Sequence, residues 1–126
     1  MTRRILIIDD EEDLREVAQV ALETLVGWQV LTAASGAEGL ERARAERPDA
    51  ILLDVMMPGD DGVAALERLK ADPGTAAIPV ILLTAKVRVA RHPPESGAAG
   101  VILKPFDPLK LAAQVAEILG WSNSEL

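Results

Sequence analysis

The chain of 126 residues contains no cysteine and no tyrosine. Without cysteine it cannot form a disulfide or a thiolate metal site, and this lack is typical of a cytoplasmic protein. The aromatic residues are confined to Trp28, Phe106 and Trp121. Three scattered rings offer no platform on which nucleic acid bases could stack.

Basic charge is also scarce, with 13 Lys and Arg against 20 Asp and Glu and a net charge of −7. A phosphate backbone would be repelled by this balance, so we predict no direct binding to nucleic acid. Residues 5–8 are apolar but too few for a signal peptide, and residues 9–13 are all acidic. No run approaches the length needed to cross a bilayer, so we predict no membrane insertion and a cytoplasmic location.

What the sequence does contain is a regular alternation of apolar runs and amphipathic segments. The apolar runs lie at residues 3–9, 28–34, 49–54, 78–85 and 99–106. Strands that alternate with helices predict an α/β fold with a parallel sheet covered on both faces. The length suits one domain, which we assign to residues 1–121, with residues 122–126 as a C-terminal tail.

The helical segments carry signals for where each helix begins, ends or is interrupted. The first helix is expected to bury one apolar stripe and to end at Gly27; the stripe consists of Leu14, Val17, Ala18, Ala21, Leu22 and Leu25. The last helix is expected to begin with Pro108 in its first turn and Leu109 facing inward. Pro93 and Pro94 should shorten or distort the fourth helix.

Polar residues stand where four of the predicted strands end. The first strand ends at Asp9 and Asp10, the third at Asp54, the fourth at Thr84 and the fifth at Lys104. Because the carboxyl ends of parallel strands meet at one edge of a sheet, these side chains are expected to lie close together.

Such an edge would need a cation. Three carboxylates roughly 4–5 Å apart repel by about 3–4 kcal/mol per pair, on the order of 10 kcal/mol in total, at an effective dielectric constant near 20. One lysine cannot offset that repulsion, and an all-oxygen site with open positions suits Mg²⁺. Asp54 could then attack a phosphoryl group while Lys104 and Thr84 contact the transferred oxygens.

Each residue alone also has an ordinary structural interpretation. The acidic run at residues 9–13 could be a solvated loop before a helix, and Asp54 a turn residue. His92, beside the double proline, fits an exposed loop, and Asp60 and Asp61 fit loop and helix-cap positions. The joint occurrence of polar residues at four strand ends favours a functional site.

Four motifs together resemble the receiver domain of bacterial two-component response regulators, over about residues 3–119: LIIDDEEDLREV, ILLDVMMPGDDG, VILLTA and LKPF. The resemblance implies a doubly wound, flavodoxin-like fold with a five-stranded parallel sheet in the order 2-1-3-4-5. It also implies a signalling phosphoacceptor rather than an enzyme with turnover.

The family's site residues carry over by position. Asp54 would be the phosphoacceptor, and Mg²⁺ would bind Asp9, Asp10, Asp54 and the backbone carbonyl of Met56. Asp10 would be the more direct ligand of the acidic pair.

The resemblance also implies the contacts of the phosphoryl group and its source. Thr84 would be the switch hydroxyl, and Lys104 would pair with the phosphate before a cis bond to Pro105. The phosphoryl group would come from a sensor histidine kinase or a phosphotransfer protein.

The sequence departs from the family at three places. Val101 stands where an aromatic residue often couples the phosphate to the output face, and Pro93 and Pro94 interrupt the fourth helix. Met56 stands where polar residues in some members position the hydrolytic water. We therefore predict slow self-dephosphorylation.

Two alternatives stay open at this stage. A receiver-like module could bind a partner without phosphorylation. A phosphatase of the haloacid-dehalogenase type would need a second aspartate where Met56 stands. The chain is either a stand-alone receiver or a part of a larger regulator. A downstream protein would read the switched surface, and a homodimer could form on phosphorylation.

Overall fold

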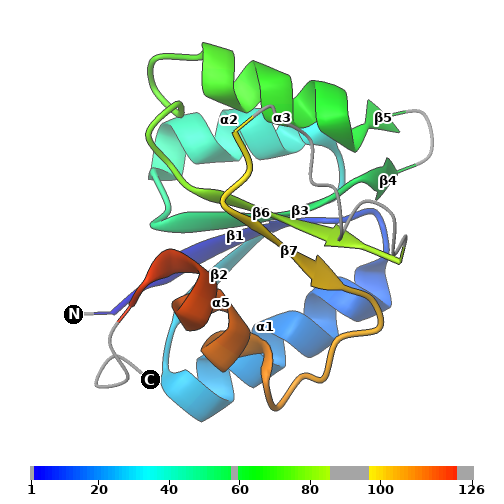
Figure 1. The fold of residues 1–126 in the computed structure, drawn as a ribbon, viewed down its shortest axis with the longest axis vertical. Coiled ribbons are helices and arrows are strands. Elements are labelled where there is room, and N and C mark those ends of the chain that lie inside the picture. Colours follow the sequence, from blue (N-terminus) through cyan, green and yellow to red (C-terminus); the bar gives the residue numbers. More distant parts are fainter. Residues whose placement is uncertain (1, 58–59, 86–96, 122–126) are drawn as a thin grey trace.

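The computed structural model describes residues 2–57, 60–85 and 97–121, in which one parallel sheet is covered by helices on both faces (Figure 1). The strands of the sheet are β1 (Arg4–Ile8), β2 (Gln29–Ala33), β3 (Ala50–Asp54), β6 (Val80–Thr84) and β7 (Gly100–Leu103). The helices are α1 (Glu12–Val26), α2 (Gly36–Glu46), α3 (Gly62–Ala71) and α5 (Leu111–Leu119).

The strand order is β2-β1-β3-β6-β7, and every pairing is parallel. Since β6 and β7 are the fourth and fifth long strands along the chain, the predicted order 2-1-3-4-5 is confirmed. A further pair, β4 (Met56–Met57) and β5 (Asp60–Asp61), is antiparallel and follows β3 directly. The sequence analysis did not predict this pair and expected loop or cap positions there.

The core has two layers, one on each face of the sheet. Ile5 and Ile7 of β1 face the layer that α1 and α5 cover, whereas Leu6 and Ile8 face the layer under α2 and α3 (Figure 1). All four side chains are fully buried. Burial of each contributes about 1.5–3 kcal/mol, so the strand that leads into the acidic run is held firmly on both faces.

Helix α1 ends at Gly27 as predicted, and α2 and α5 also have caps at one end. Gly27 and Gly120 adopt left-handed backbone angles, with φ of 72° and 70°, and end α1 and α5. The Ser35 hydroxyl accepts a hydrogen bond of 3.2 Å from the Glu38 N–H at the start of α2.

Two expectations about buried faces are wrong. Val17 and Leu25 of the predicted stripe are 47% and 52% exposed, whereas Ala18, Ala21 and Leu22 are buried and Leu14 packs partly buried against the core. Leu109 is 76% exposed.

The position of Leu109 follows from a later helix start. The Asp107 carboxylate accepts the Leu109 N–H at 2.9 Å and forms a turn. Pro108 lies in that turn, and α5 begins only at Leu111. The predicted inward position of Leu109 therefore lies outside the helix.

The predicted cis bond between Lys104 and Pro105 is present. The expected irregular helix at Pro93 and Pro94, like His92, lies outside the described residues. Among the helices that the structure describes, none combines the length and the apolar composition needed to cross a membrane.

Candidate functional site

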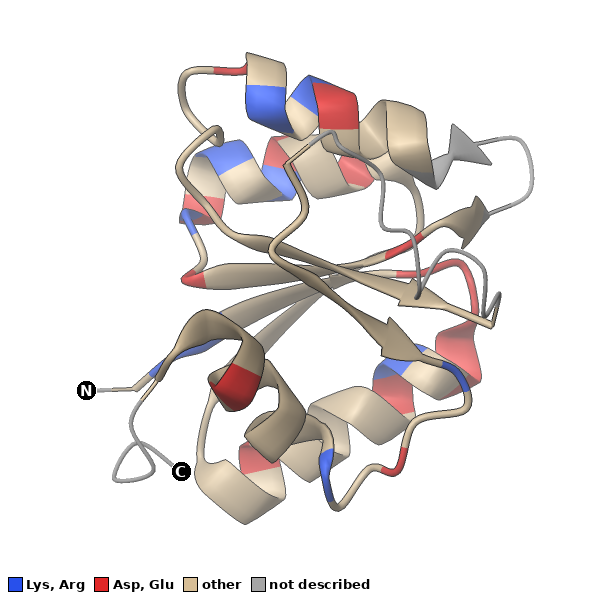
Figure 2. Ribbon diagram, in the orientation of Figure 1, with Lys and Arg blue, Asp and Glu red and all other residues tan. Residues whose placement is uncertain are grey.

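The predicted site residues lie at one edge of the sheet. Asp54 and Thr84 are the last residues of β3 and β6, and Asp9 and Lys104 directly follow β1 and β7. Parallel register brings these ends level, since Asp54 pairs with Leu83 and the Lys104 N–H donates to the Thr84 carbonyl at 2.8 Å. Figure 2 shows acidic residues gathered on this side, at the ends of β1 and β3 and the start of α1.

Three carboxylates meet at this edge. One oxygen from each of Asp9, Asp10 and Asp54 lies within 4.8 Å of the other two. Asp9 and Asp54 are 0% and 1% exposed, whereas Asp10 is exposed. The carboxylate cluster is therefore buried at Asp9 and Asp54 and open to solvent at Asp10.

The Lys104 ammonium lies between the carboxylates. Its Nζ is 2.8 Å from Oδ2 of Asp9, 3.4 Å from Oδ2 of Asp54 and 3.7 Å from Oε1 of Glu11. Its side chain is 13% exposed, so these charges are poorly screened by solvent. One ammonium therefore serves three carboxylates.

The two oxygens of each buried carboxylate are held differently. Oδ1 of Asp54 accepts the Met56 N–H at 2.9 Å, and Oδ1 of Asp9 accepts the Glu11 N–H at 3.0 Å. The Oδ2 atoms of both aspartates are buried, and neither accepts a hydrogen bond in suitable geometry from the described residues. The charged group nearest to both Oδ2 atoms is the Lys104 ammonium, and a divalent cation would share these oxygens with it as ligand atoms.

Burial and neighbouring groups have opposing effects on the pKa values of Asp54 and Lys104. Burial raises the pKa of Asp54, the Met56 N–H lowers it, the Asp9 charge raises it and Lys104 lowers it, and the net pKa is above the ordinary value. Burial would lower the pKa of Lys104, but the carboxylates of Asp9, Asp54 and Glu11 outweigh it and raise this pKa. The carboxylates thus favour the charged form of Lys104, and burial together with the Asp9 charge makes ionisation of Asp54 less favourable than that of a free aspartate.

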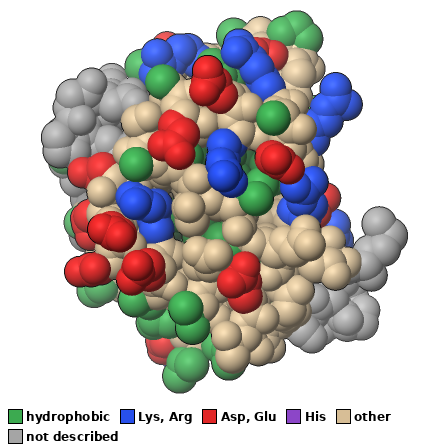
Figure 3. Space-filling model, turned by 180° about the vertical axis from the view of Figure 1, so that it is seen from behind, with side chains coloured by type: hydrophobic (Ala, Val, Ile, Leu, Met, Phe, Trp, Pro, Cys, Tyr) green, Lys and Arg blue, Asp and Glu red, His purple; other side chains and the backbone are tan. Residues whose placement is uncertain are grey.

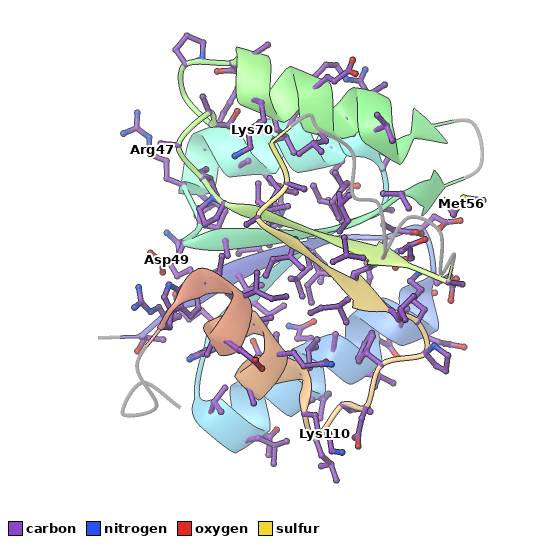
Figure 4. The ribbon with its side chains drawn as sticks, in the orientation of Figure 1. Arg47, Asp49, Met56, Lys70 and Lys110 are labelled. Carbon is purple, nitrogen blue, oxygen red and sulfur yellow. The ribbon has the colours of Figure 1, made fainter. Side chains whose placement is uncertain are left out.

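The remaining predicted residues lie around this centre. Thr84 is fully buried at the end of β6. Met56 lies on the same side of the molecule as the strand ends, and its side chain is 52% exposed (Figure 4). Asp49, which is not a predicted site residue, lies just before β3 at the opposite end of the sheet (Figure 4). Val101 is partly buried and packs against the core layer under α2 and α3.

The sequence analysis missed two contributors. Glu11 approaches Lys104, and Nη1 of Arg15 donates to the Asp9 carbonyl at 2.8 Å. The acidic run was the only signal for Glu11. Nothing in the spacing pointed to Arg15, because its contact reaches from the first turn of α1 back across the preceding loop.

An apolar groove lies beside the site. It has a volume of about 490 Å³ and runs between α1 and the turn before α5, with Val17, Val20, Leu25 and Leu109 in its lining. Val17 also lines a smaller hollow that includes Glu11. In the view from behind, acidic side chains gather on the left and hydrophobic ones lie below them (Figure 3).

The family model for the response regulator receiver domain matches residues 5–116. The phosphate regulon transcriptional regulatory protein PhoB of Pseudomonas aeruginosa is 42% identical over 123 residues, which cover 93% of this chain and 52% of PhoB. The DNA-binding response regulator MtrA of Mycolicibacterium paratuberculosis is 36% identical over 127 residues, covering 99% of this chain and 55% of MtrA. The chain thus spans about half the length of these curated relatives.

Solved structures of response regulators of similar size are also similar to this chain. The chemotaxis response regulator CheY4 of Vibrio cholerae has a TM-score of 0.85 and 28% identity, with 94% of this chain and 99% of CheY4 covered. The N-terminal domain of a response regulator receiver protein from Methanoculleus marisnigri has a TM-score of 0.74 and 38% identity, with 94% and 98% covered.

Proposed function

Because this chain belongs to the response regulator receiver family and so acts in two-component signalling, we propose that Asp54 is its phosphoacceptor. The observation that carries the proposal is the Oδ2 atom of Asp54. It is buried, accepts no hydrogen bond from the described residues and lies 3.4 Å from an ammonium. A nucleophile needs such an oxygen, held still and not committed to another donor.

The residues at this edge fit Mg²⁺. Oxygen ligands, two of them without hydrogen bonds, surround one position, and the exposed Asp10 leaves that position open to solvent. Asp9, Asp10, Asp54 and the carbonyl of Met56 would hold the ion. When bound, Mg²⁺ would neutralise the carboxylates and the charge on the transferred oxygens.

The reaction itself requires little movement of the protein. Oδ2 of Asp54 forms a bond to phosphorus as the bond from phosphorus to the donor nitrogen breaks, and the electron pair stays on the departing imidazole. Lys104, already beside Oδ2, would pair with the phosphoryl oxygens, and the Thr84 hydroxyl would hydrogen-bond to one of them. The Met56 N–H holds the other carboxylate oxygen and so fixes the direction of attack.

The family signals rather than turning over a substrate as a conventional enzyme does. The finer part of the proposal is that this chain catalyses only its own phosphorylation and dephosphorylation. A phosphatase of the haloacid-dehalogenase type would need an acid at residue 56, where Met56 offers a thioether.

Response regulators interact with histidine kinases and with downstream targets. We propose that a kinase or phosphotransfer protein docks over the apolar groove, since that groove adjoins the site through Val17.

The prediction of no direct nucleic acid binding is not confirmed, because PhoB and MtrA are named as transcriptional or DNA-binding regulators and are about twice as long. We also propose that residues 1–121 form one domain, that residues 122–126 are a C-terminal tail, and that the protein is cytoplasmic.

The direct test is phosphorylation by acetyl phosphate with Mg²⁺, followed by intact mass measurement. The wild-type protein should gain one labile phosphoryl group, and Asp54→Asn should gain none. Asp49→Asn is the matched control, because Asp49 lies before the opposite end of β3 and should leave the reaction unchanged. Absence of any adduct would favour a module that acts without phosphorylation, and continuous release of phosphate from many esters would favour a phosphatase.

A further inference from the structure

Three hydrogen bonds hold Asp9 in place. Its N–H donates to the carbonyl of Ala33, the last residue of β2, at 3.0 Å. Its Oδ1 accepts the Glu11 N–H at 3.0 Å, and its carbonyl accepts Nη1 of Arg15 at 2.8 Å. With these groups satisfied, Oδ2 of Asp9 faces the Lys104 ammonium at 2.8 Å and, in the proposed site, the cation.

Arg15 is the only partner that holds Asp9 through a side chain. The other two partner groups, the Ala33 carbonyl and the Glu11 N–H, belong to the backbone, so a substitution at residue 15 does not remove them. Arg15 also joins the loop through its own N–H, which donates to the Glu11 carbonyl at 3.1 Å. Its guanidinium therefore ties the first turn of α1 to the loop at residues 9–11, which carries both acidic residues of the pair.

We propose that Arg15 is a positioning residue that raises the affinity of the site for Mg²⁺ by holding this loop in its ligating conformation. The inference rests on the proposed Mg²⁺ site. β1 ends at Ile8, so the sheet does not fix the Asp9 carbonyl. Without the guanidinium, that carbonyl would turn toward water, and the Asp9 and Asp10 carboxylates would have to be ordered when the ion binds.

Simple electrostatics makes the opposite prediction, which allows a sharp test. Arg15 carries a positive charge near the site, so its removal would reduce repulsion of a divalent cation and tighten binding. Loss of positioning would weaken binding instead. The sign of the change in Mg²⁺ affinity thus separates the two roles.

The experiment is a calorimetric Mg²⁺ titration of wild type, Arg15→Met and Arg15→Lys. Arg15→Met keeps the aliphatic stem and should bind Mg²⁺ about tenfold more weakly, in the range found for residues that orient metal ligands. Arg15→Lys keeps one donor and should lie between the two. In phosphorylation by acetyl phosphate, the Mg²⁺ concentration for half-maximal rate should rise similarly, while the rate at saturating Mg²⁺ changes less than about twofold.

Arg4→Met is the matched control. Nη1 of Arg4 also donates to a backbone carbonyl, that of Glu46 at 2.7 Å, but Arg4 begins β1 at the far end of the sheet. It should lower the thermal midpoint in EDTA without changing Mg²⁺ affinity. Equal or tighter Mg²⁺ binding by Arg15→Met would overturn the inference. Absence of Mg²⁺ binding by the wild type would instead overturn the proposed function.

Discussion

Asp54→Asn should make the metal-free protein more stable. The substitution keeps an oxygen that can accept the Met56 N–H and removes one buried negative charge. It therefore separates the cost of holding that charge at the site from the packing of β3. A buried carboxylate that a cation would neutralise should lower the free energy of unfolding when that cation is absent.

The size of the effect follows from the distances. At an effective dielectric constant of about 20, Asp9 at up to 4.8 Å repels Asp54 by about 3.5 kcal/mol, and Lys104 at 3.4 Å attracts it by about 5 kcal/mol. The exposed Asp10 adds about 1 kcal/mol of repulsion after screening. Charges thus nearly cancel, and burial of the carboxylate decides the sign. Desolvation of several kcal/mol, less about 1.5–3 kcal/mol from the Met56 hydrogen bond, leaves about 1–3 kcal/mol of stabilisation in the variant.

The pH dependence has a defined direction. Burial raises the pKa of Asp54 above its ordinary value of 3.8, so the folded protein binds this proton more tightly than the unfolded chain does. The proton's contribution to stability is complete below 3.8 and is lost as pH rises through the folded pKa. The advantage of Asp54→Asn should therefore grow from acid to neutral pH.

Thermal unfolding in EDTA, followed by tryptophan fluorescence at several pH values, measures the difference. At neutral pH the midpoint of Asp54→Asn should exceed that of the wild type by at least about 3 °C. Asp72→Asn is the opposite control, because the Gly74 N–H and then Arg44 lower the pKa of Asp72, so its loss should lower the midpoint. A variant less stable than wild type in EDTA at neutral pH would refute the reasoning.

Three further predictions follow from individual contacts. Lys104→Met should tighten Mg²⁺ binding about tenfold in a calorimetric titration, since the ammonium competes for the same Oδ2 atoms, and weaker binding would contradict this. Gly39→Ala should cost about 1–3 kcal/mol in urea unfolding, because its Cβ would lie 2.3 Å from Cδ1 of the buried Ile8, and an unchanged midpoint would show that α2 can shift freely. Met56→Asn should shorten the half-life of the phosphorylated protein, and no change or a longer half-life would remove Met56 as the reason for slow dephosphorylation.

Much of the fold could be read from short-range pattern. Continuous apolar runs such as residues 50–53 are typical of strands buried on both faces of a parallel sheet, and Gly27 and Gly120 are the residue type that ends helices in left-handed backbone angles. The order of the strands in the sheet could not be predicted from local pattern. It depends on which apolar surfaces meet in space, and only the resemblance to a known family supplied it.

The site was predictable as far as it rests on strand ends. Asp54 and Lys104 each terminate an apolar run, so a parallel sheet places both at one edge, and the strand order then brings them close together. Arg15 acts through a backbone carbonyl six residues earlier, and no spacing rule marks such a contact. The β4 and β5 pair is two residues long in each strand, too short to show a period. Leu109 was misplaced because the turn at Asp107 delays the helix.

The position of the phosphoryl group is the most direct test of the account. The wild-type protein would be phosphorylated with acetyl phosphate and Mg²⁺, reduced with borohydride to convert an acyl phosphate into homoserine, and digested for peptide sequencing by mass spectrometry. The account predicts homoserine at residue 54 and at no other aspartate, including Asp9 and Asp10. Homoserine at another position, or a stable phosphate on a hydroxyl such as Thr84, would contradict it.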